Sequence, residues 1–265
     1  MKKRVVVWGT GNVGRPAIRA VLAHRDLELV GVIVSDPAKV GRDAGEIAGV
    51  ARAGIQATAD WRGLLQQLQP DAVVYAATAD TRGAEAFMEL LGCLEAGVNV
   101  VSSAFYPLLY PECGLEAAVA PVLEACRKGN SSVFVSGIDP GWAMDILPIL
   151  ASGVVADIHE IRVQEVFNYA LYDQPRVVRE VIGFGQGMAQ LPRMLEDFSL
   201  KMVWEPMVRV MAAALEYPLD SVETYVERRA LEQAVDVPGM GVFDQGTQGA
   251  FRFEVRGIRN GVTRL

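Results

Sequence analysis

The sequence predicts an α/β protein: a Rossmann domain with a doubly wound parallel sheet, followed by an α+β domain. Two observations carry this prediction. Up to residue 136, short unbroken apolar runs alternate with helical patterns, which is typical of a parallel sheet covered on both faces. After Gly137 this alternation ends, and segments typical of antiparallel strands follow. We therefore expect one domain over residues 1–137 and a second domain over residues 138–265.

Composition and charge narrow the classes of function. Hydrophobic residues make up 51% of the 265 residues and charged residues 22%, which suffices for a substantial core. The net charge is -7 and the Lys and Arg residues are spread along the chain, so we expect no nucleic-acid partner. No apolar stretch reaches the ~18–20 residues of a membrane span, so we expect a cytoplasmic protein without membrane contact. Three cysteines without paired spacing and two histidines predict no metal site.

The first element is a strand over Val5–Trp8 that leads into a glycine-rich turn and a helix over Pro16–His24. In this context Gly9 allows a sharp turn, Gly11 leaves room for a pyrophosphate, and Gly14 lets the helix approach the strand. Amides at the helix N-terminus then face the phosphates. The alternative is a turn that serves packing alone. The expected cofactor-binding residues are Gly9, Thr10, Gly11, Asn12, Val13 and Gly14.

The second strand is expected over Leu27–Val34. In a dinucleotide-binding unit, the residues after this strand contact the adenosine ribose and thereby distinguish NAD from NADP. Asp36 can accept hydrogen bonds from the ribose hydroxyls of NAD and would repel the 2′-phosphate of NADP. Ser35 and Lys39 can instead bind that phosphate, unless Lys39 is simply a solvated charge. The sequence therefore predicts NAD or NADP as the cofactor without choosing between them.

The first domain continues with alternating helices and strands. We expect helices over Trp61–Leu68, Gly83–Ala96 and Leu115–Arg127, and strands over Ala72–Ala77, Val98–Ser102 and Ser132–Ser136. Ligands in such a sheet bind at the carboxyl ends of the strands, so the nicotinamide half of the cofactor is expected beside Ala77, Thr78 and Ser102. Cys93 and Cys126 fall inside helical patterns and are expected to pack.

The second domain is expected to begin with a helix over Ala143–Leu150 and a strand over Ile158–Val166. Residues 167–173 are rich in aromatic rings and polar tips, which suits either a pocket lining or packing at a sheet edge. Further expected elements are a turn at Gly183–Gly187, a helix over Leu200–Leu215, and strands over Val222–Arg229 and Ala250–Arg256.

The end of the sequence predicts a β-hairpin. Asn260 and Gly261 lie between strand-like flanks, and Asn-Gly is favoured in two-residue hairpin turns. Only four residues follow this pair, so the second strand of the hairpin is short. We therefore expect the natural chain to continue beyond Leu265.

Several longer stretches are more specific than the glycine turn alone: VVVWGTGNVGRPAIRAV, SDPAKVGRDAGEIAG, EAGVNVVSS, GIDPGWAMDILP and VFNYALYDQPRVVREVIGFG. Together they resemble proteins with a dihydrodipicolinate-reductase-like N-terminal domain, and among them the native amine dehydrogenase and 2,4-diaminopentanoate dehydrogenase group. The resemblance implies a nicotinamide cofactor, reversible reductive amination or imine reduction of small molecules, and a homodimer. Residues 1–137 are then the dinucleotide-binding Rossmann domain, and residues 138–265 the substrate-binding and dimerisation domain. It also implies that Trp142, Tyr169 and Tyr172 line the substrate pocket.

Two departures from the family pattern bear on the chemistry. The paired histidines and following lysine of true dihydrodipicolinate reductases are absent, which excludes that lysine-biosynthesis reaction. The amine dehydrogenase group places a glutamate shortly after the strand that ends here at Ser102. Phe105 takes that position in this chain, and we expect it to line the substrate pocket. The candidates for the catalytic proton donor are then Tyr106, Glu112 and Glu165, although each also suits a surface or packing role.

These observations predict an NAD(P)-dependent oxidoreductase that transfers a hydride to or from a small imine, amine or carbonyl compound. The alternative is a non-catalytic or redox-sensing NAD(P)-binding protein, which the missing glutamate favours. A sugar dehydrogenase of the glucose-fructose oxidoreductase kind is disfavoured, because the Glu-Lys-Pro sequence expected after the corresponding strand is absent.

Overall fold

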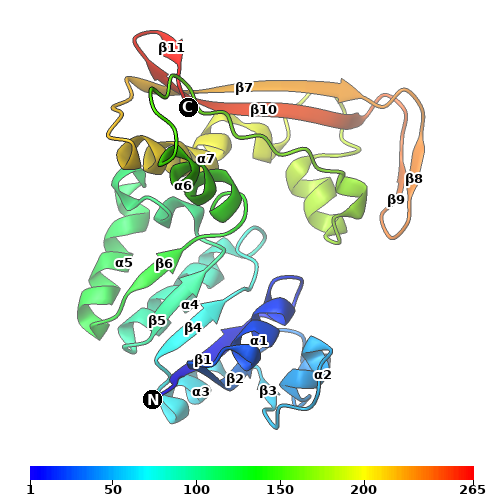
Figure 1. Cartoon of the computed structure of the whole chain (residues 1–265). Helices are drawn as coiled ribbons and strands as arrows, with labels where there is room; N and C mark the ends of the chain where they lie inside the picture. Colours follow the sequence, from blue (N-terminus) through cyan, green and yellow to red (C-terminus); the bar gives the residue numbers. More distant parts are fainter. The chain divides into compact units, whose positions relative to one another are not determined.

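The computed structural model describes residues 1–265, which form two compact units (Figure 1). The first unit comprises Met1–Leu109 and Leu115–Gly137, and the second comprises Tyr110–Gly114 and Ile138–Leu265. Residues 110–114 join the second unit because the short helix η3 (Pro111–Cys113) packs against α7 (Asp197–Ala214).

The centre of the first unit is a six-stranded sheet. Its strands are β1 (Lys3–Trp8), β2 (Leu27–Ile33), β3 (Ala57–Thr58), β4 (Ala72–Tyr75), β5 (Asn99–Ser102) and β6 (Val133–Val135). All are parallel, in the order β3-β2-β1-β4-β5-β6. The strand order reverses between β1 and β4, as in a doubly wound Rossmann sheet, so the predicted fold class of this unit is confirmed.

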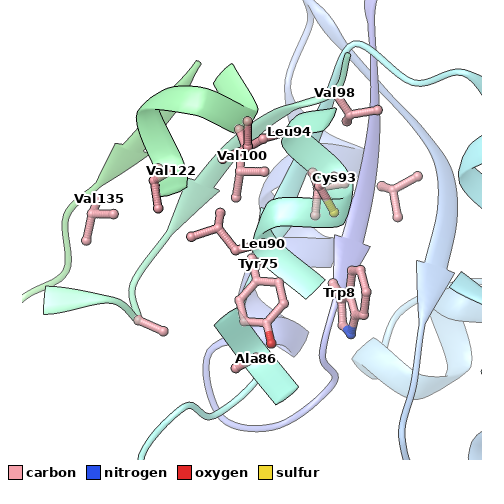
Figure 2. Packing of buried hydrophobic residues seen from close by; sticks show 14 of the residues in the cluster. Trp8, Tyr75, Ala86, Leu90, Cys93, Leu94, Val98, Val100, Val122 and Val135 are labelled. Atoms are coloured by element: carbon pink, nitrogen blue, oxygen red, sulfur yellow. The ribbon is translucent and has the colours of Figure 1, made fainter. Parts of the chain in front are cut away.

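Helices cover both faces of this sheet. They are α1 (Gly14–Ala23), α2 (Ala44–Ala48), α3 (Trp61–Leu68), α4 (Gly83–Glu95) and α5 (Glu116–Gly129), with the short 3₁₀ helices η1 (Pro37–Lys39) and η2 (Tyr106–Leu108). Alternate residues of β1 point to opposite faces: Val6 and Trp8 pack with α3, α4 and α5, and Val5 and Val7 pack with α1 and α2. Figure 2 shows the first of these clusters, in which Cys93 is fully buried. Cys126 packs at its edge, so both cysteines pack as predicted.

The segment between β2 and α3 contains α2 and β3, which the sequence did not predict. Its geometry depends on Asp43, which is 3% exposed. One carboxylate oxygen of Asp43 accepts hydrogen bonds from the amides of Gly45 and Ala53 at 2.8 and 2.9 Å, and the other accepts one from Gly54 at 2.8 Å. A single side chain thus caps α2 and holds the returning chain. These contacts join residues about ten positions apart, so a local pattern does not reveal them.

The second unit is an α+β arrangement. Its helices, besides η3 and α7, are the π-helix η4 (Trp142–Ile146), α6 (Leu147–Ser152), η5 (Tyr169–Leu171), the π-helix η6 (Val177–Ile182) and η7 (Arg193–Leu195). Its strands are β7 (Ser221–Ala230), β8 (Val235–Val237), β9 (Gly241–Phe243), β10 (Gln248–Arg259) and β11 (Val262–Thr263). The order β11-β10-β7 forms an antiparallel sheet, and β8 and β9 form a small hairpin at one end of the β7–β10 ribbon (Figure 1).

The core of this unit lies between α7 and the β7–β10 ribbon. Met207, Val208 and Met211 of α7 are buried together with Val222 of β7. The turn Asn260-Gly261 joins β10 to β11 with positive φ at both residues, 52° and 70°, and Arg259 pairs with Val262. These angles are those of a type I′ turn, so the predicted hairpin is confirmed.

Two elements of the second unit differ from the prediction. The expected strand Ile158–Val166 is wrong: the segment has no regular secondary structure. Its amides make a single backbone hydrogen bond, from Ile161 to the carbonyl of Arg264 at 2.9 Å. Alternation sets the faces that side chains take, but a strand also needs a partner backbone along its length. The helix expected at Ala143–Leu150 begins instead at Trp142 as a π-helix and continues as α6.

Candidate cofactor and substrate sites

The turn after β1 requires glycine at two positions. Gly9 has a φ of +97°, and a Cβ there would lie 2.7 Å from the carbonyl carbon of Ala76. A Cβ on Gly14 would lie 1.9 Å from the carbonyl oxygen of Gly9. Gly11 differs from both, because it is exposed and a Cβ there would meet nothing within 4 Å. The loop is therefore tightly packed at its ends and open at its middle, which leaves room for a phosphate group.

The start of α1 completes this cradle. Val13 is the N-cap residue, no side chain caps the helix, and the first turn carries no acidic residue. The positive end of the helix dipole is thus left for an external anion. The cradle adjoins the residues after β4, because a Cβ on Gly9 would lie 2.7 Å from both the carbonyl carbon of Ala76 and the amide nitrogen of Ala77. It therefore lies at the point where the strand order reverses, which is where such sheets bind dinucleotides.

The residues after β2 lie near the same loop. Ser35 and Asp36 are exposed, and the Asp36 carboxylate accepts a hydrogen bond from the amide of Ala38 at 2.9 Å as the cap of η1. The ammonium of Lys39 lies 3.4 Å from both the carbonyl oxygen and the hydroxyl of Thr10. The positive charge of Lys39 is thus held against the glycine turn.

The carboxyl ends of β4 and β5 carry the other expected cofactor residues. Thr78 is exposed, and its hydroxyl donates to Asp80 at 3.5 Å. Ser102 is buried: its hydroxyl donates to the carbonyl of Tyr75 at 3.1 Å and accepts from the amide of Ala104 at 3.0 Å. The side chain of Ser102 therefore joins two strands within the fold.

Phe105 follows β5 in the left-handed region, with a φ of 61°. Its half-buried ring packs on Tyr75, with centroids 5.3 Å apart. The Tyr75 hydroxyl donates to Glu89 at 2.5 Å, and Arg82 forms an ion pair with the same carboxylate. Burial and the carboxylate of Glu89 raise the pKa of Tyr75 well above its usual value. The acid of this network, Glu89, thus already has Arg82 as its ion-pair partner, and we propose a structural role for it. The sequence did not reveal this cluster.

The second unit contains a cavity of about 1180 Å³. Its aromatic wall is continuous: the ring of Trp204 lies 4.5 Å from Phe253, and Tyr169 lies 5.7 Å from Phe251 and 5.3 Å from Phe184. Phe251 and Phe253 share one face of β10 because they are two residues apart. The apolar part of the cavity is thus built by β10, α7 and the loop residues between α6 and α7.

The second unit contains carboxylates in the wall of this cavity and one buried carboxylate outside the wall. Asp139 and Glu165 are in its wall, and the indole N–H of Trp204 donates to Asp139 at 2.9 Å. Asp145 is 2% exposed, and its Oδ2 has no hydrogen-bond partner. Burial, and then the charge of Asp139, raise the pKa of Asp145 to about 6. The same two causes raise the pKa of Glu165.

The expected substrate and proton-donor residues are distributed unevenly. Glu165 and Tyr169 line the cavity, whereas Trp142 in η4 and Tyr172 do not, although the Tyr172 ring lies 5.9 Å from Tyr169. Glu112 is exposed on η3 and lies outside the cavity wall. Tyr106 is half-buried in the first unit, at the start of η2.

Sequence reasoning missed Asp139 and Asp145 as site residues. Both lie in the stretch GIDPGWAMDILP. The presence of two acidic residues among Gly, Pro and Trp in this stretch could have indicated a site.

Comparisons with known proteins agree with this geometry. Residues 3–104 match the family model described as dihydrodipicolinate reductase, N-terminus. Over 261 residues the chain is 49% identical to the amine dehydrogenase of Streptomyces virginiae, which covers 98% of this chain and 72% of that protein. The chain belongs to the amine dehydrogenase family. The resemblance inferred from the sequence is thus confirmed.

Two further similar proteins have a lower sequence identity to this chain. The 2,4-diaminopentanoate dehydrogenase of Acetoanaerobium sticklandii is 26% identical over 202 residues, covering 71% of this chain and 54% of that protein. The solved structure of an amine dehydrogenase from Mycobacterium smegmatis superposes with a TM-score of 0.76 at 20% identity, covering 97% of this chain and 75% of that one. This chain is accordingly an oxidoreductase with a Rossmann domain. None of its helices is both long and apolar enough to span a membrane.

Proposed function

We propose that this chain catalyses the NAD(P)-dependent, reversible oxidative deamination of small amines. The observation that carries the proposal is the 49% identity to an amine dehydrogenase over 98% of the chain, together with the intact glycine cradle. When bound, the nicotinamide cofactor supplies or accepts the hydride. The protein then has to bind the cofactor, orient the substrate and move a proton.

The residues of the first unit suit a dinucleotide. The open position at Gly11, the uncapped start of α1 and the ammonium of Lys39 together offer space and positive potential for a pyrophosphate. We propose Gly9–Gly14 and Lys39 as the phosphate-binding residues, and Ala77 and Thr78 as neighbours of the nicotinamide half.

We further propose that NAD is preferred over NADP. Asp36 presents a carboxylate at the end of β2, held in place by its bond to the Ala38 amide, and this charge would repel a 2′-phosphate. Lys39, which could otherwise neutralise that phosphate, lies against Thr10. Both observations favour a cofactor with a free ribose 2′-hydroxyl.

For the proton-transfer step we propose Glu165. The family resemblance implies a glutamate shortly after β5, and Phe105 takes that position in this chain. Among the alternatives, Glu112 is outside the cavity and Tyr106 is a phenol, whereas Glu165 lies in the cavity wall with a raised pKa. A carboxyl group whose pKa moves toward neutral pH is better matched to general acid–base work.

The test is the reduction of NAD⁺ and NADP⁺ followed at 340 nm with a panel of primary amines, and the reverse reaction with aldehydes and ketones in concentrated ammonia. We expect turnover that Gly11→Val abolishes, because the added side chain would fill the phosphate space. Cofactor binding without turnover of any amine or carbonyl compound would contradict the proposal and favour a non-catalytic NAD(P)-binding protein.

The family resemblance also supports a homodimer as part of this proposal. Analytical ultracentrifugation of the full chain measures it, and a single monomeric species at micromolar concentration would contradict it.

A further inference from the structure

The β8–β9 hairpin forms part of the wall of the cavity in the second unit. Its strands pair with each other and with no strand of the larger sheet, and they bend away from the β7–β10 ribbon (Figure 1). One face of the hairpin lines the cavity with Val235, Val237 and Phe243. Asp236 and Val242 pair on the opposite face, are exposed, and lie outside the cavity wall. The hairpin therefore separates the cavity from solvent on this side.

The hairpin has little backbone support of its own. Its ladder consists of three residue pairs, and an isolated two-stranded hairpin is at best marginally stable in water. At its base, the amide of Leu231 donates to the carbonyl of Thr247 at 2.8 Å, and the amide of Gly246 donates to the carbonyl of Leu231 at 2.9 Å. Beyond this base, the position of the hairpin depends on side-chain contacts.

Arg179 of η6 supplies the polar contacts. Its guanidinium donates to the carbonyl of Met240 at 2.6 and 3.2 Å and to the carbonyl of Val242 at 3.0 Å. The guanidinium carbon also lies 4.0 Å from the centre of the Phe243 ring. Arg179 is partly exposed and is not part of any ion pair. Water can therefore replace these hydrogen bonds when they break, and no buried charge is left without a partner.

A small apolar cluster completes the closed arrangement. Val178 of η6 is 1% exposed and packs with Val237 and Phe243 of the hairpin, which are 9% and 6% exposed. Tyr169 and Phe184 pack at the edge of this cluster, and all five residues belong to the cavity wall. The hairpin is thus held on η6 by one arginine and a few apolar side chains.

We propose that the β8–β9 hairpin is a movable lid over this part of the cavity and that Arg179 is the latch that holds it closed. Opening turns the hairpin about its base at Leu231 and Thr247, breaks the Arg179 hydrogen bonds and separates Phe243 from Val178. The wall behind the hairpin then becomes accessible to solvent and to small molecules. Segments with few buried contacts are those that open without unfolding of the whole domain. The inference is independent of the amine chemistry proposed above.

The first test is hydrogen–deuterium exchange of the full chain, without cofactor. We expect Arg179→Gln to raise the exchange rate of the amides of residues 235–243 by roughly tenfold or more, because hydrogen bonds from a charged group stabilise a contact on this scale. The amides of β7 and β10 should exchange as in wild type. Arg176→Gln is the matched control, because Arg176 precedes η6, is exposed, and pairs with Glu180. We expect it to change exchange in the hairpin by less than about twofold.

The second test measures access to the wall behind the hairpin. Val178→Cys places a thiol of similar size at this covered position. Its reaction with N-ethylmaleimide, followed by mass spectrometry, should be slow, and roughly tenfold faster when Arg179→Gln is added. Cys93 is fully buried in the first unit, so its reaction reports unfolding and should be the same in both variants.

Three outcomes would overturn the proposal. Unchanged exchange in the hairpin of Arg179→Gln would show that Arg179 is not its latch. Equally faster exchange throughout β7 and β10 would show that Arg179 supports the whole unit. Faster exchange in the hairpin with an unchanged reaction of the introduced thiol would show that the hairpin moves without uncovering the cavity. No measurement uses cofactor, substrate or turnover, so the result is separate from success or failure of the proposed function.

Discussion

Asp36 and Asp43 of the first unit each receive hydrogen bonds from backbone amides, but their exposure differs. Asp36 is exposed at the end of β2 and bonds only the amide of Ala38. Asp43 is buried and bonds several amides on both sides of a loop. We therefore propose that Asp36 selects the ligand and that Asp43 has a structural role.

Removal of the Asp36 charge should change cofactor preference. We expect Asp36→Asn to raise the affinity for NADPH relative to NADH by about 1 kcal/mol, roughly fivefold, because a charge that repels the 2′-phosphate is lost at a solvated site. The amide oxygen of Asn still caps η1. Asp36→Ala removes the cap as well, and calorimetry with both cofactors compares the two variants. An unchanged ratio of dissociation constants in both would show that Asp36 does not reach the ribose.

Removal of the Asp43 charge should destabilise the first unit in a pH-dependent way. The amide hydrogen bonds, that of Ala53 first, lower the pKa of Asp43 below its usual 3.8. A depressed carboxyl pKa stabilises the fold above that value, and the contribution is lost as pH falls through the folded-state pKa. We expect Asp43→Asn to lower the urea midpoint at pH 7, and the difference from wild type to narrow below pH 4. A difference that is constant from pH 7 to pH 3 would contradict an electrostatic origin.

At the scale of elements, the approach of α1 to β1 depends on backbone contacts that leave no room for side chains. A Cβ on Gly14 would overlap the carbonyl of Gly9, and a Cβ on Gly9 would overlap the backbone of Ala76 after β4. Three segments thus meet without intervening Cβ atoms. Gly11 lies in the same turn but makes no such contact.

Two substitutions in this turn should separate stability from binding. We expect Gly14→Ala to cost about 1–3 kcal/mol of unfolding free energy, because its Cβ overlaps a backbone oxygen that has to move. Gly11→Val should change stability by less than about 0.5 kcal/mol and yet abolish NADH binding, because its side chain occupies the open space. Urea unfolding and NADH titration of both variants are the measurements. Full NADH affinity in Gly11→Val would contradict the phosphate-binding role of this turn.

At the scale of the whole chain, buried acids in the two units respond to pH in opposite directions. Asp43 in the first unit has a lowered pKa, and Asp145 in the second has a pKa raised to about 6. For an acid with a raised pKa, the folded state binds a proton between the unfolded and folded pKa values. The free energy of unfolding therefore falls as the pH rises from the unfolded-state pKa of Asp145 through its folded-state pKa of about 6. Below the unfolded-state pKa this destabilisation is absent.

Asp145→Asn should therefore stabilise the protein at alkaline pH. We expect a gain of about 1 kcal/mol at pH 8 once solvent screening is allowed for, and almost no gain at pH 4. The measurement is the urea midpoint of wild type and variant across this range. A variant that is less stable than wild type at pH 8 would contradict this prediction, because it would mean that the charge of Asp145 stabilises the folded protein.

By itself, the sequence determined three features of this protein. The alternation of apolar runs and helical patterns predicted the Rossmann domain, the glycine-rich turn predicted the cradle, and the longer motifs indicated the family. Each of these predictions depends on residues that are close together in the sequence. Gly9, Gly11 and Gly14 lie within six positions, and the apolar run Val5–Trp8 by itself indicates a buried strand. The Asn260-Gly261 turn was predictable for the same reason, since two residues with positive φ suffice to define it.

Only the tertiary structure decided where Asp139, Asp145 and Glu165 lie and that Ile158–Val166 forms no strand. The Asp139 carboxylate accepts a hydrogen bond from the indole of Trp204, 65 positions away in the sequence. The segment Ile158–Val166 forms no strand because no other backbone pairs with it along its length. Burial, pairing and pKa depend on neighbours that folding brings together from distant positions, and local periodicity carries no information about them. The candidate cofactor cradle could thus be inferred from the sequence, whereas the acidic cavity could be recognised only in the fold.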